Sequence, residues 1–172
     1  LLIGTEPTVG IKPSTTYSFI VLVTPVGPYY KEGFTPVEAV VLEEYDRAAP
    51  KGTGRAKMAG NYAASLKPGI EAKKLGYPIV LFSDPKENRY VDEFGTSNFI
   101  GITADGQYQT PESPSILQSI TNESLQVLAK EIGLKVVRTA IPLEGLDRFQ
   151  EVGACGTAAV ITPVYSVKYR SR

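Results

Sequence analysis

Residues 52–62 read GTGRAKMAGNY, a glycine-rich loop with one lysine between a predicted strand and a predicted helix. Lys57 lies among glycines and alanines, which leave room for a planar molecule beside its amine. Weakly polar surroundings disfavour an ammonium ion and favour the neutral amine, a nucleophile that forms a Schiff base with a carbonyl. A plain loop with a solvated lysine has the same pattern, so the stretch alone leaves both interpretations open.

Regular elements are expected on both sides of this loop. Before it, residues 37–45 (VEAVVLEEY) are typical of a strand. After Asn61, apolar residues recur at helical spacing as far as Gly76, a residue typical of helix ends. Pro68 interrupts this pattern and lacks a backbone donor, so we expect two short helices or a kink there.

The rest of the chain alternates strands and helices without strict regularity. Asp105 and Gly106 give a strong hairpin-turn signal, and a helix is expected from Thr121, its N-cap candidate, to Gly133. The run at 17–24 is apolar enough for a buried strand, and 142–149 is expected to form a short helix. Further strands are expected at 77–83, 89–93, 97–102, 134–141 and 156–164. These elements predict an α+β fold, a mixed α/β sheet curled into a partial barrel with flanking helices.

Composition excludes several functions. The 172 residues, 42% of them hydrophobic, are enough for one substantial core. Eighteen basic residues balance eighteen acidic ones, so nothing favours nucleic acid or a membrane as a partner. Histidine is absent, which excludes an imidazole-activated nucleophile and the usual zinc sites, so no metal is expected. One cysteine and the lack of a long apolar run or signal peptide predict a cytoplasmic protein.

Six pieces of the chain occur in the order and at the spacing of a known family. They are IGTEPTVG (3–10), TPVGPYY (24–30), RAKMAGNYAASL (55–66), YVDEFGTSNFIGI (90–102), SILQSITNESL (115–125) and GACGTAAVITPV (153–164). Together they resemble the class IV pyridoxal-phosphate-dependent aminotransferases, and most closely the branched-chain amino-acid aminotransferases.

This resemblance implies a truncated chain that contains mainly the large C-terminal domain of such an enzyme. Residues 1–24 are then a remnant of the small N-terminal domain, 25–35 the connector between domains, and 36–172 the large cofactor-binding domain, incomplete at its C-terminus. In the family, much of the apolar substrate pocket and a major phosphate-binding arginine come from the small domain. We therefore expect little activity from this fragment by itself.

The resemblance also implies roles for individual residues. Lys57 matches the lysine that forms a Schiff base with pyridoxal 5'-phosphate, and Tyr62 matches the tyrosine on the cofactor's phenolic oxygen. Glu93 matches the acid that pairs with the pyridine nitrogen; from sequence alone it is equally a solvated glutamate at a strand end. Asp92 faces the opposite side of the strand, so the two acids should not share a role.

Two segments match the family's phosphate and substrate contacts. A phosphate is expected at the start of a helix, where free N–H groups favour an anion; the residues there are Ser119, Ile120 and Thr121. This chain reads LQSITN at that point, where many members of the family read LPGITR or LPGVVR. Thr157 matches a phosphate-binding threonine, and Thr157 with Ala158 matches the turn that receives the substrate carboxylate. Arg47 matches an arginine near the phosphate in some members, but a surface salt bridge explains it equally well.

The expected activity is transamination between leucine, isoleucine or valine and 2-oxoglutarate, and the expected assembly is a homodimer. A D-amino-acid aminotransferase or an aminodeoxychorismate lyase of the same fold type is the first alternative. A non-catalytic remnant that acts as an interaction module is the second. Binding of pyridoxal phosphate, and its loss on Lys57→Ala, separates the remnant from the enzymes.

Overall fold

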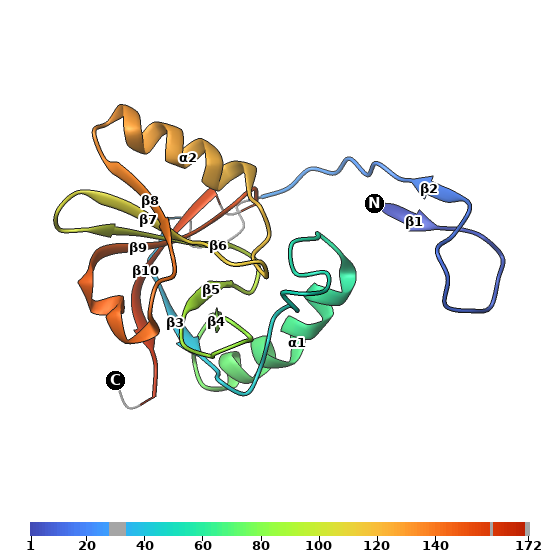
Figure 1. Cartoon of the computed structure of the whole chain (residues 1–172), viewed down its shortest axis with the longest axis horizontal. Helices are drawn as coiled ribbons and strands as arrows, with labels where there is room; N and C mark the ends of the chain where they lie inside the picture. Colours follow the sequence, from blue (N-terminus) through green and yellow to red (C-terminus); the bar gives the residue numbers. More distant parts are fainter. Residues whose placement is uncertain (28–33, 159, 171–172) are drawn as a thin grey trace.

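The computed structural model describes residues 1–27, 34–158 and 160–170 (Figure 1). Residues 28–33, in the predicted connector and in part of the TPVGPYY motif, lie outside the described residues, as do 159 and 171–172. The division into a remnant, a connector and a large domain therefore stays a prediction.

Ten strands, two α-helices and one 3₁₀ helix make up the described residues. In chain order they are β1 (Leu2–Gly4), β2 (Tyr17–Phe19), β3 (Val37–Val41), α1 (Ala59–Lys74), β4 (Ile79–Ser83), β5 (Val91–Phe94), β6 (Asn98–Thr103), β7 (Gln107–Pro111), α2 (Ile120–Glu131), β8 (Lys135–Thr139), η1 (Leu143–Arg148), β9 (Phe149–Gly156) and β10 (Val160–Lys168).

Eight of these strands form one mixed sheet in the order β5-β4-β3-β10-β9-β6-β7-β8. A further pairing between β5 and β6 closes the first six strands into a ring, while β7 and β8 extend from it (Figure 1). Strand β3 pairs in parallel with β4 on one side and with β10 on the other. The pairs β4–β5, β9–β10 and β6–β9 are antiparallel. The predicted mixed sheet curled into a partial barrel is confirmed.

Strand β6 is shared between the ring and its extension. Its first residue, Asn98, pairs with Glu93 on β5, whereas Gly101 further along pairs with Gln109 on β7. A side chain on Gly101 would begin only 2.5 Å from the ring of Phe149, so glycine is required at this crossing. The predicted hairpin turn follows, with Gly106 at a φ of 78°.

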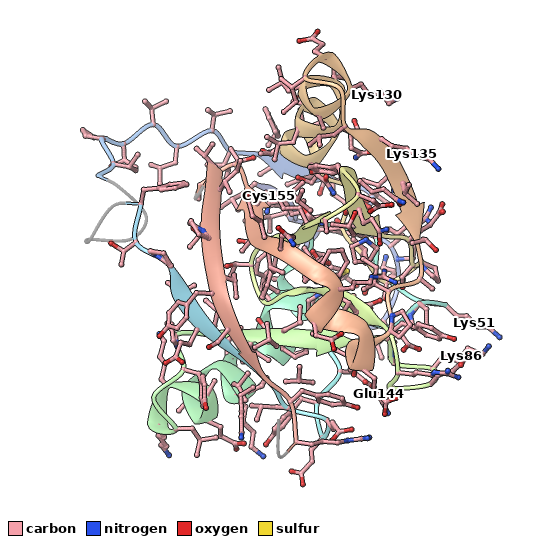
Figure 2. The ribbon with its side chains drawn as sticks, turned by 90° about the vertical axis from the view of Figure 1, so that its left-hand side faces the viewer. Lys51, Lys86, Lys130, Lys135, Glu144 and Cys155 are labelled. Atoms are coloured by element: carbon pink, nitrogen blue, oxygen red, sulfur yellow. The ribbon has the colours of Figure 1, made fainter. Side chains whose placement is uncertain are left out.

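Apolar residues fill the ring and also cover its outer surface under each helix. The ring interior holds a cluster that includes Leu81, Phe94 and Phe99. Helix α1 packs on the outer surface of β3 and β4 through Ala72, and α2 packs on β9 through Ala129. Figure 2 shows Cys155 on β9 inside the molecule, whereas Lys51, Lys86, Lys130 and Lys135 project outwards.

Helix α1 differs from the expectation. It runs unbroken from Ala59 to Lys74 with Pro68 inside it, so the first expected alternative, two short helices, is wrong, and the second, a kink at Pro68, stays a prediction. Proline removes a single backbone donor, and the Pro68 ring is fully buried. Burial of this face of α1 offsets the missing hydrogen bond.

Helix α2 begins two residues earlier than expected. Its N-cap is Ser119, whose side chain accepts a hydrogen bond from the Asn122 N–H, so the prediction that Thr121 is the N-cap is wrong. The predicted end holds, since Gly133 follows at a φ of 88°. On the expected apolar face Ala129 is buried, whereas Leu128 is 53% exposed.

The apolar run 17–24 does not form a buried strand. Only Tyr17–Phe19 is a strand, and it pairs antiparallel with Leu2–Gly4 in a separate two-stranded sheet, at one side of the main sheet in Figure 1. Leu22 and Val23 are 82% and 90% exposed. The expectation of burial fails because, among the described residues, no second layer covers this hairpin.

Two further properties of residues 1–27, 34–158 and 160–170 bear on function. Within these ranges, no helix combines the length and apolar character needed to cross a membrane. The same ranges hold no group of three or more His, Cys, Asp or Glu side chains suited to a metal ion.

Candidate active site

The loop that carries Lys57 is fixed by a buried amide on α1. Asn61 is 5% exposed, and its Nδ2 donates to the carbonyl oxygens of Thr53 and Ala56 at 2.7 and 2.9 Å. Its Oδ1 accepts from the Thr53 hydroxyl at 3.0 Å. All of these bonds link the first turn of α1 to the loop before it, so Asn61 fixes the backbone of the loop at Lys57.

Lys57 and Tyr62 lie side by side. The Lys57 Nζ donates a hydrogen bond of 2.6 Å to the Tyr62 hydroxyl and lies 5.0 Å from the centre of its ring. Lys57 is exposed, so the enclosed amine expected from its small neighbours is not what the described residues provide. They present instead an accessible amine paired with a phenol.

Glu93 is buried at the centre of the site. It is 4% exposed, and its Oε1 accepts from the Arg47 guanidinium at 2.7 Å and from the Leu117 N–H at 2.9 Å. Its Oε2 accepts from Asn98 Nδ2 at 3.2 Å. Both carboxylate oxygens are therefore held, and the alternative of a solvated glutamate is wrong.

The protonation of Glu93 reflects opposing effects. Burial raises the pKa of Glu93 to about 7, while Arg47, the Leu117 N–H and the charge of Lys57 pull that pKa down. The effect of Lys57 shows that its ammonium and this carboxylate lie in one electrostatic environment. That these two residues contact opposite parts of one ligand stays a prediction.

Arg47 belongs to this buried network. It is 6% exposed, and besides Glu93 it donates to the carbonyl oxygens of Gly54, at 3.3 Å, and of Ser115. Its Nε has no hydrogen-bond partner among the described residues. These contacts rule out a plain surface salt bridge, and a contact of Arg47 with a phosphate stays a prediction.

The N-terminus of α2 provides free donors near Glu93. The N–H groups of Ile120 and Thr121 lie in the first turn of the helix, so they have no intrahelical acceptor. The segment that leads into this turn is bonded to Glu93 through the Leu117 N–H. An anion at the start of α2 would meet both these donors and the positive end of the helix dipole.

The turn with Thr157 and Ala158 lies at the end of β9, and both residues are exposed. Cys155, two residues before Thr157, pairs with Asn98 on β6, and Asn98 pairs with Glu93 on β5. The register of three adjacent strands thus places this turn at the same edge of the sheet as Glu93.

Three residues of the site were not expected from the sequence. Asn61 clamps the lysine loop, Asn98 bonds to Glu93, and Ser115 accepts from Arg47. Asn61 had a local signal, because asparagine at the start of a helix readily bonds to nearby backbone. Asn98 and Ser115 act across distant segments, which periodicity cannot reveal.

The described residues include an accessible amine, a buried acid and free N–H donors, and the comparisons with known proteins identify the family of the chain. A family model described as amino-transferase class IV matches residues 3–167. The chain belongs to the class IV aminotransferases. Its resemblance to this family, inferred from the six motifs, is confirmed.

Relatives of this class IV aminotransferase chain carry a more specific name. A branched-chain-amino-acid aminotransferase of Helicobacter pylori is 46% identical over 99% of this chain and 51% of its own length. A branched-chain aminotransferase of Thermoproteus uzoniensis, solved with norvaline, has a TM-score of 0.76 and 27% identity over 87% of this chain and 50% of its own. The Thermobaculum terrenum enzyme in its PLP form has a TM-score of 0.72 and 29% identity, over 79% and 44%. The chain spans about half the length of these relatives.

Proposed function

We propose that the whole protein is a branched-chain-amino-acid aminotransferase that uses pyridoxal 5'-phosphate bound through Lys57. The observation that carries the proposal is the buried carboxylate of Glu93, held by Arg47 and within electrostatic reach of Lys57. Family membership supports it, as does the relative in Helicobacter pylori, which bears this name.

The chemistry of the donor set fits this cofactor. An amine suits its aldehyde, a buried carboxylate suits its ring nitrogen, and free N–H groups suit its phosphate. Lys57, Glu93 and the start of α2 supply these three groups in that order. The related enzyme of Thermobaculum terrenum was solved in its PLP form.

Each residue then has a distinct task. When bound, pyridoxal 5'-phosphate supplies an electron-accepting ring through which an amino group passes between an amino acid and a 2-oxo acid. Lys57 forms the covalent link and afterwards, as a free amine, moves the proton at the substrate Cα. Glu93 holds a proton on the ring nitrogen, and the Tyr62 hydroxyl orients the ring by a hydrogen bond to the cofactor's phenolic oxygen.

The ends of the site hold the anionic groups. The N–H groups of Ile120 and Thr121 bind the phosphate, with the hydroxyl of Thr157 beside them. The turn at Thr157 and Ala158 receives the substrate carboxylate. Arg47 contacts Glu93 and lowers the pKa of its carboxyl group, which favours the ionised form.

We propose leucine, isoleucine and valine as amino donors and 2-oxoglutarate as acceptor. The names of the relatives support the donors, and norvaline in the enzyme of Thermoproteus uzoniensis is likewise an aliphatic amino acid. A homodimer and a cytoplasmic location stay predictions. The low activity expected of this fragment alone is a prediction of the same kind.

Cofactor binding is tested on the 172-residue chain. It is mixed with pyridoxal phosphate, visible absorbance is recorded, and the adduct is reduced with borohydride and located by mass spectrometry. We expect absorbance and an adduct on Lys57, both lost in Lys57→Ala and both kept in Lys51→Ala. Lys51 is the matched control, an exposed lysine on the same loop that points away from the protein (Figure 2).

Equal labelling of the two variants, or no absorbance at all, contradicts the proposal and favours an interaction module without cofactor. Substrate choice is tested on the full-length protein with leucine and D-alanine as donors. Transfer from leucine supports the proposal. Transfer from D-alanine alone would identify a D-amino-acid aminotransferase instead.

A further inference from the structure

A second buried acid, Asp92, lies next to Glu93 on β5 and has no task in the proposed reaction. It is 2% exposed. Its Oδ2 accepts a hydrogen bond from the hydroxyl of Ser115, while its Oδ1 has no partner among the described residues. Burying a carboxylate is costly unless its hydrogen bonds offset the lost hydration, so this acid calls for a structural or functional reason.

Ser115 connects the two acids of β5. The residue is fully buried, its hydroxyl donates to Asp92, and its carbonyl oxygen accepts from the Arg47 guanidinium. Arg47 in turn holds Glu93 at 2.7 Å. Asp92 is thus linked to Glu93 around the strand, through one serine and one arginine, although the two side chains point to opposite faces.

The same segment supplies another partner of Glu93. Leu117, two residues after Ser115, donates its N–H to Glu93 Oε1 at 2.9 Å. On its other side the segment packs on Gly54, where an added Cβ would lie 2.7 Å from the Ser115 Cα. A shift of Ser115 would therefore move two of the groups that hold Glu93, Arg47 and the Leu117 N–H.

We propose that Ser115 is a positioning residue for the buried acid: anchored by Asp92, it holds Arg47 and the Leu117 N–H against Glu93, which favours the ionised form of that carboxylate and fixes its direction. The purpose of this arrangement rests on the proposed function, in which an ionised Glu93 keeps a proton on the ring nitrogen. The arrangement itself is a property of the chain alone.

The charges around Glu93 fix the direction of the expected effect. Burial raises its pKa to about 7, Arg47 and the Leu117 N–H lower it, Asp92 raises it and Lys57 lowers it. The buried thiol of Cys155 also lies within electrostatic reach. When Arg47 and the Leu117 N–H lose their anchor, burial acts with less opposition and the pKa of Glu93 rises.

The test measures the ionisation of Glu93 in the 172-residue chain without cofactor, by carbon-13 NMR of the glutamate carboxyl carbons. Glu93→Gln identifies the signal. In Ser115→Ala we expect the pKa of Glu93 to rise by about one unit. Ser83→Ala is the matched control, since Ser83 is a buried serine of β4 whose hydroxyl bonds to Asn88 at 3.3 Å, and it should leave the pKa unchanged.

Two variants of Asp92 repeat the test without a substitution in the 113–117 segment. Asp92→Asn and Asp92→Ala both remove the charge, but only alanine also removes the acceptor of the Ser115 hydroxyl. We therefore expect a higher pKa of Glu93 in Asp92→Ala than in Asp92→Asn. This comparison decides the matter if Ser115→Ala fails to fold.

Equal pKa values in that pair, or an unchanged pKa in a folded Ser115→Ala, would overturn the inference. The readout is independent of the cofactor. If Lys57 is labelled by pyridoxal phosphate while Ser115→Ala leaves Glu93 unchanged, the inference fails and the proposed function stands. If Ser115→Ala raises the pKa of Glu93 but pyridoxal phosphate does not label Lys57, the inference stands and the proposed function fails.

Discussion

The guanidinium of Arg47 and the carboxylate of Glu93 form an ion pair of 2.7 Å, with side chains only 7% and 5% exposed. The pair joins the loop after β3 to strand β5, and carbonyl oxygens of Gly54 and Ser115 take further guanidinium N–H bonds. A buried charge that loses its partner costs far more than an exposed one. The lysine loop, β5 and the segment before α2 therefore depend on this one pair.

Replacing Arg47 by methionine should destabilise the fold strongly. The change keeps an apolar stem but leaves the Glu93 carboxylate buried without a cation. We expect the free energy of unfolding to fall by about 3–5 kcal/mol at neutral pH, measured by chemical denaturation. The loss should be smaller at pH 5, where Glu93 is protonated.

Arg170→Met serves as its control. Arg170 pairs with Glu43 at 2.8 Å, but these side chains are 56% and 37% exposed, and exposed pairs contribute little. A much smaller loss is therefore expected. Equal losses in the two variants would contradict the importance given to the buried pair.

The pKa of Glu93 predicts how stability depends on pH. The folded chain holds the Glu93 proton up to about pH 7, whereas a glutamate without these neighbours releases it near the ordinary value of 4.5. Between these values the folded state binds more protons, so the free energy of unfolding falls as pH rises from 4.5 to 7 and then levels off. The contribution is on the order of 3 kcal/mol.

Glu93→Gln should remove this slope, and denaturation at several pH values measures it. Asp84 and Asp92 contribute slopes of their own, because the pKa of Asp84 is lowered and that of Asp92 raised. Those slopes remain in the variant, so the difference between wild type and variant isolates Glu93. As a control, Glu123→Gln, at an exposed position, should leave the dependence of stability on pH unchanged. If stability depends on pH in Glu93→Gln as it does in the wild type, burial does not raise the pKa of Glu93.

Local signals account for what could be predicted from the sequence. The turn at Gly106 and the helix end at Gly133 both require positive φ, which glycine adopts readily, and both are found. Lys57 and Tyr62 are five residues apart across the start of α1, so their contact depends on local geometry alone. These features need no knowledge of distant segments.

What the sequence could not reveal depends on partners far along the chain. Strand β9 (Phe149–Gly156) has no clear strand pattern because Gly153 and Gly156 interrupt it, and pairing with β6 and β10 holds it in place. The burial of Arg47 depends in the same way on Ser115, which packing brings beside it. A buried cation and an exposed one look alike in sequence.

Gly54 should tolerate no side chain. A methyl group there would lie 2.7 Å from the carbonyl oxygen of Ala49 and 2.7 Å from the Cα of Ser115. Both are backbone atoms, which cannot turn aside as a flexible side chain can. We expect Gly54→Ala to lower the free energy of unfolding by about 1–3 kcal/mol, measured by chemical denaturation.

Gly60 offers a matched control six residues later in the same motif. It lies in the first turn of α1, and an added Cβ there would meet nothing within 4 Å. Alanine favours a helix and restricts the unfolded chain, so Gly60→Ala should stabilise the protein by about 0.5–1 kcal/mol. The two substitutions add the same methyl group, and opposite signs are expected because only Gly54 lies against the segment of Ser115. A loss in both would mean that the motif needs glycine for flexibility, and a loss in neither would mean that this segment can move away from the lysine loop.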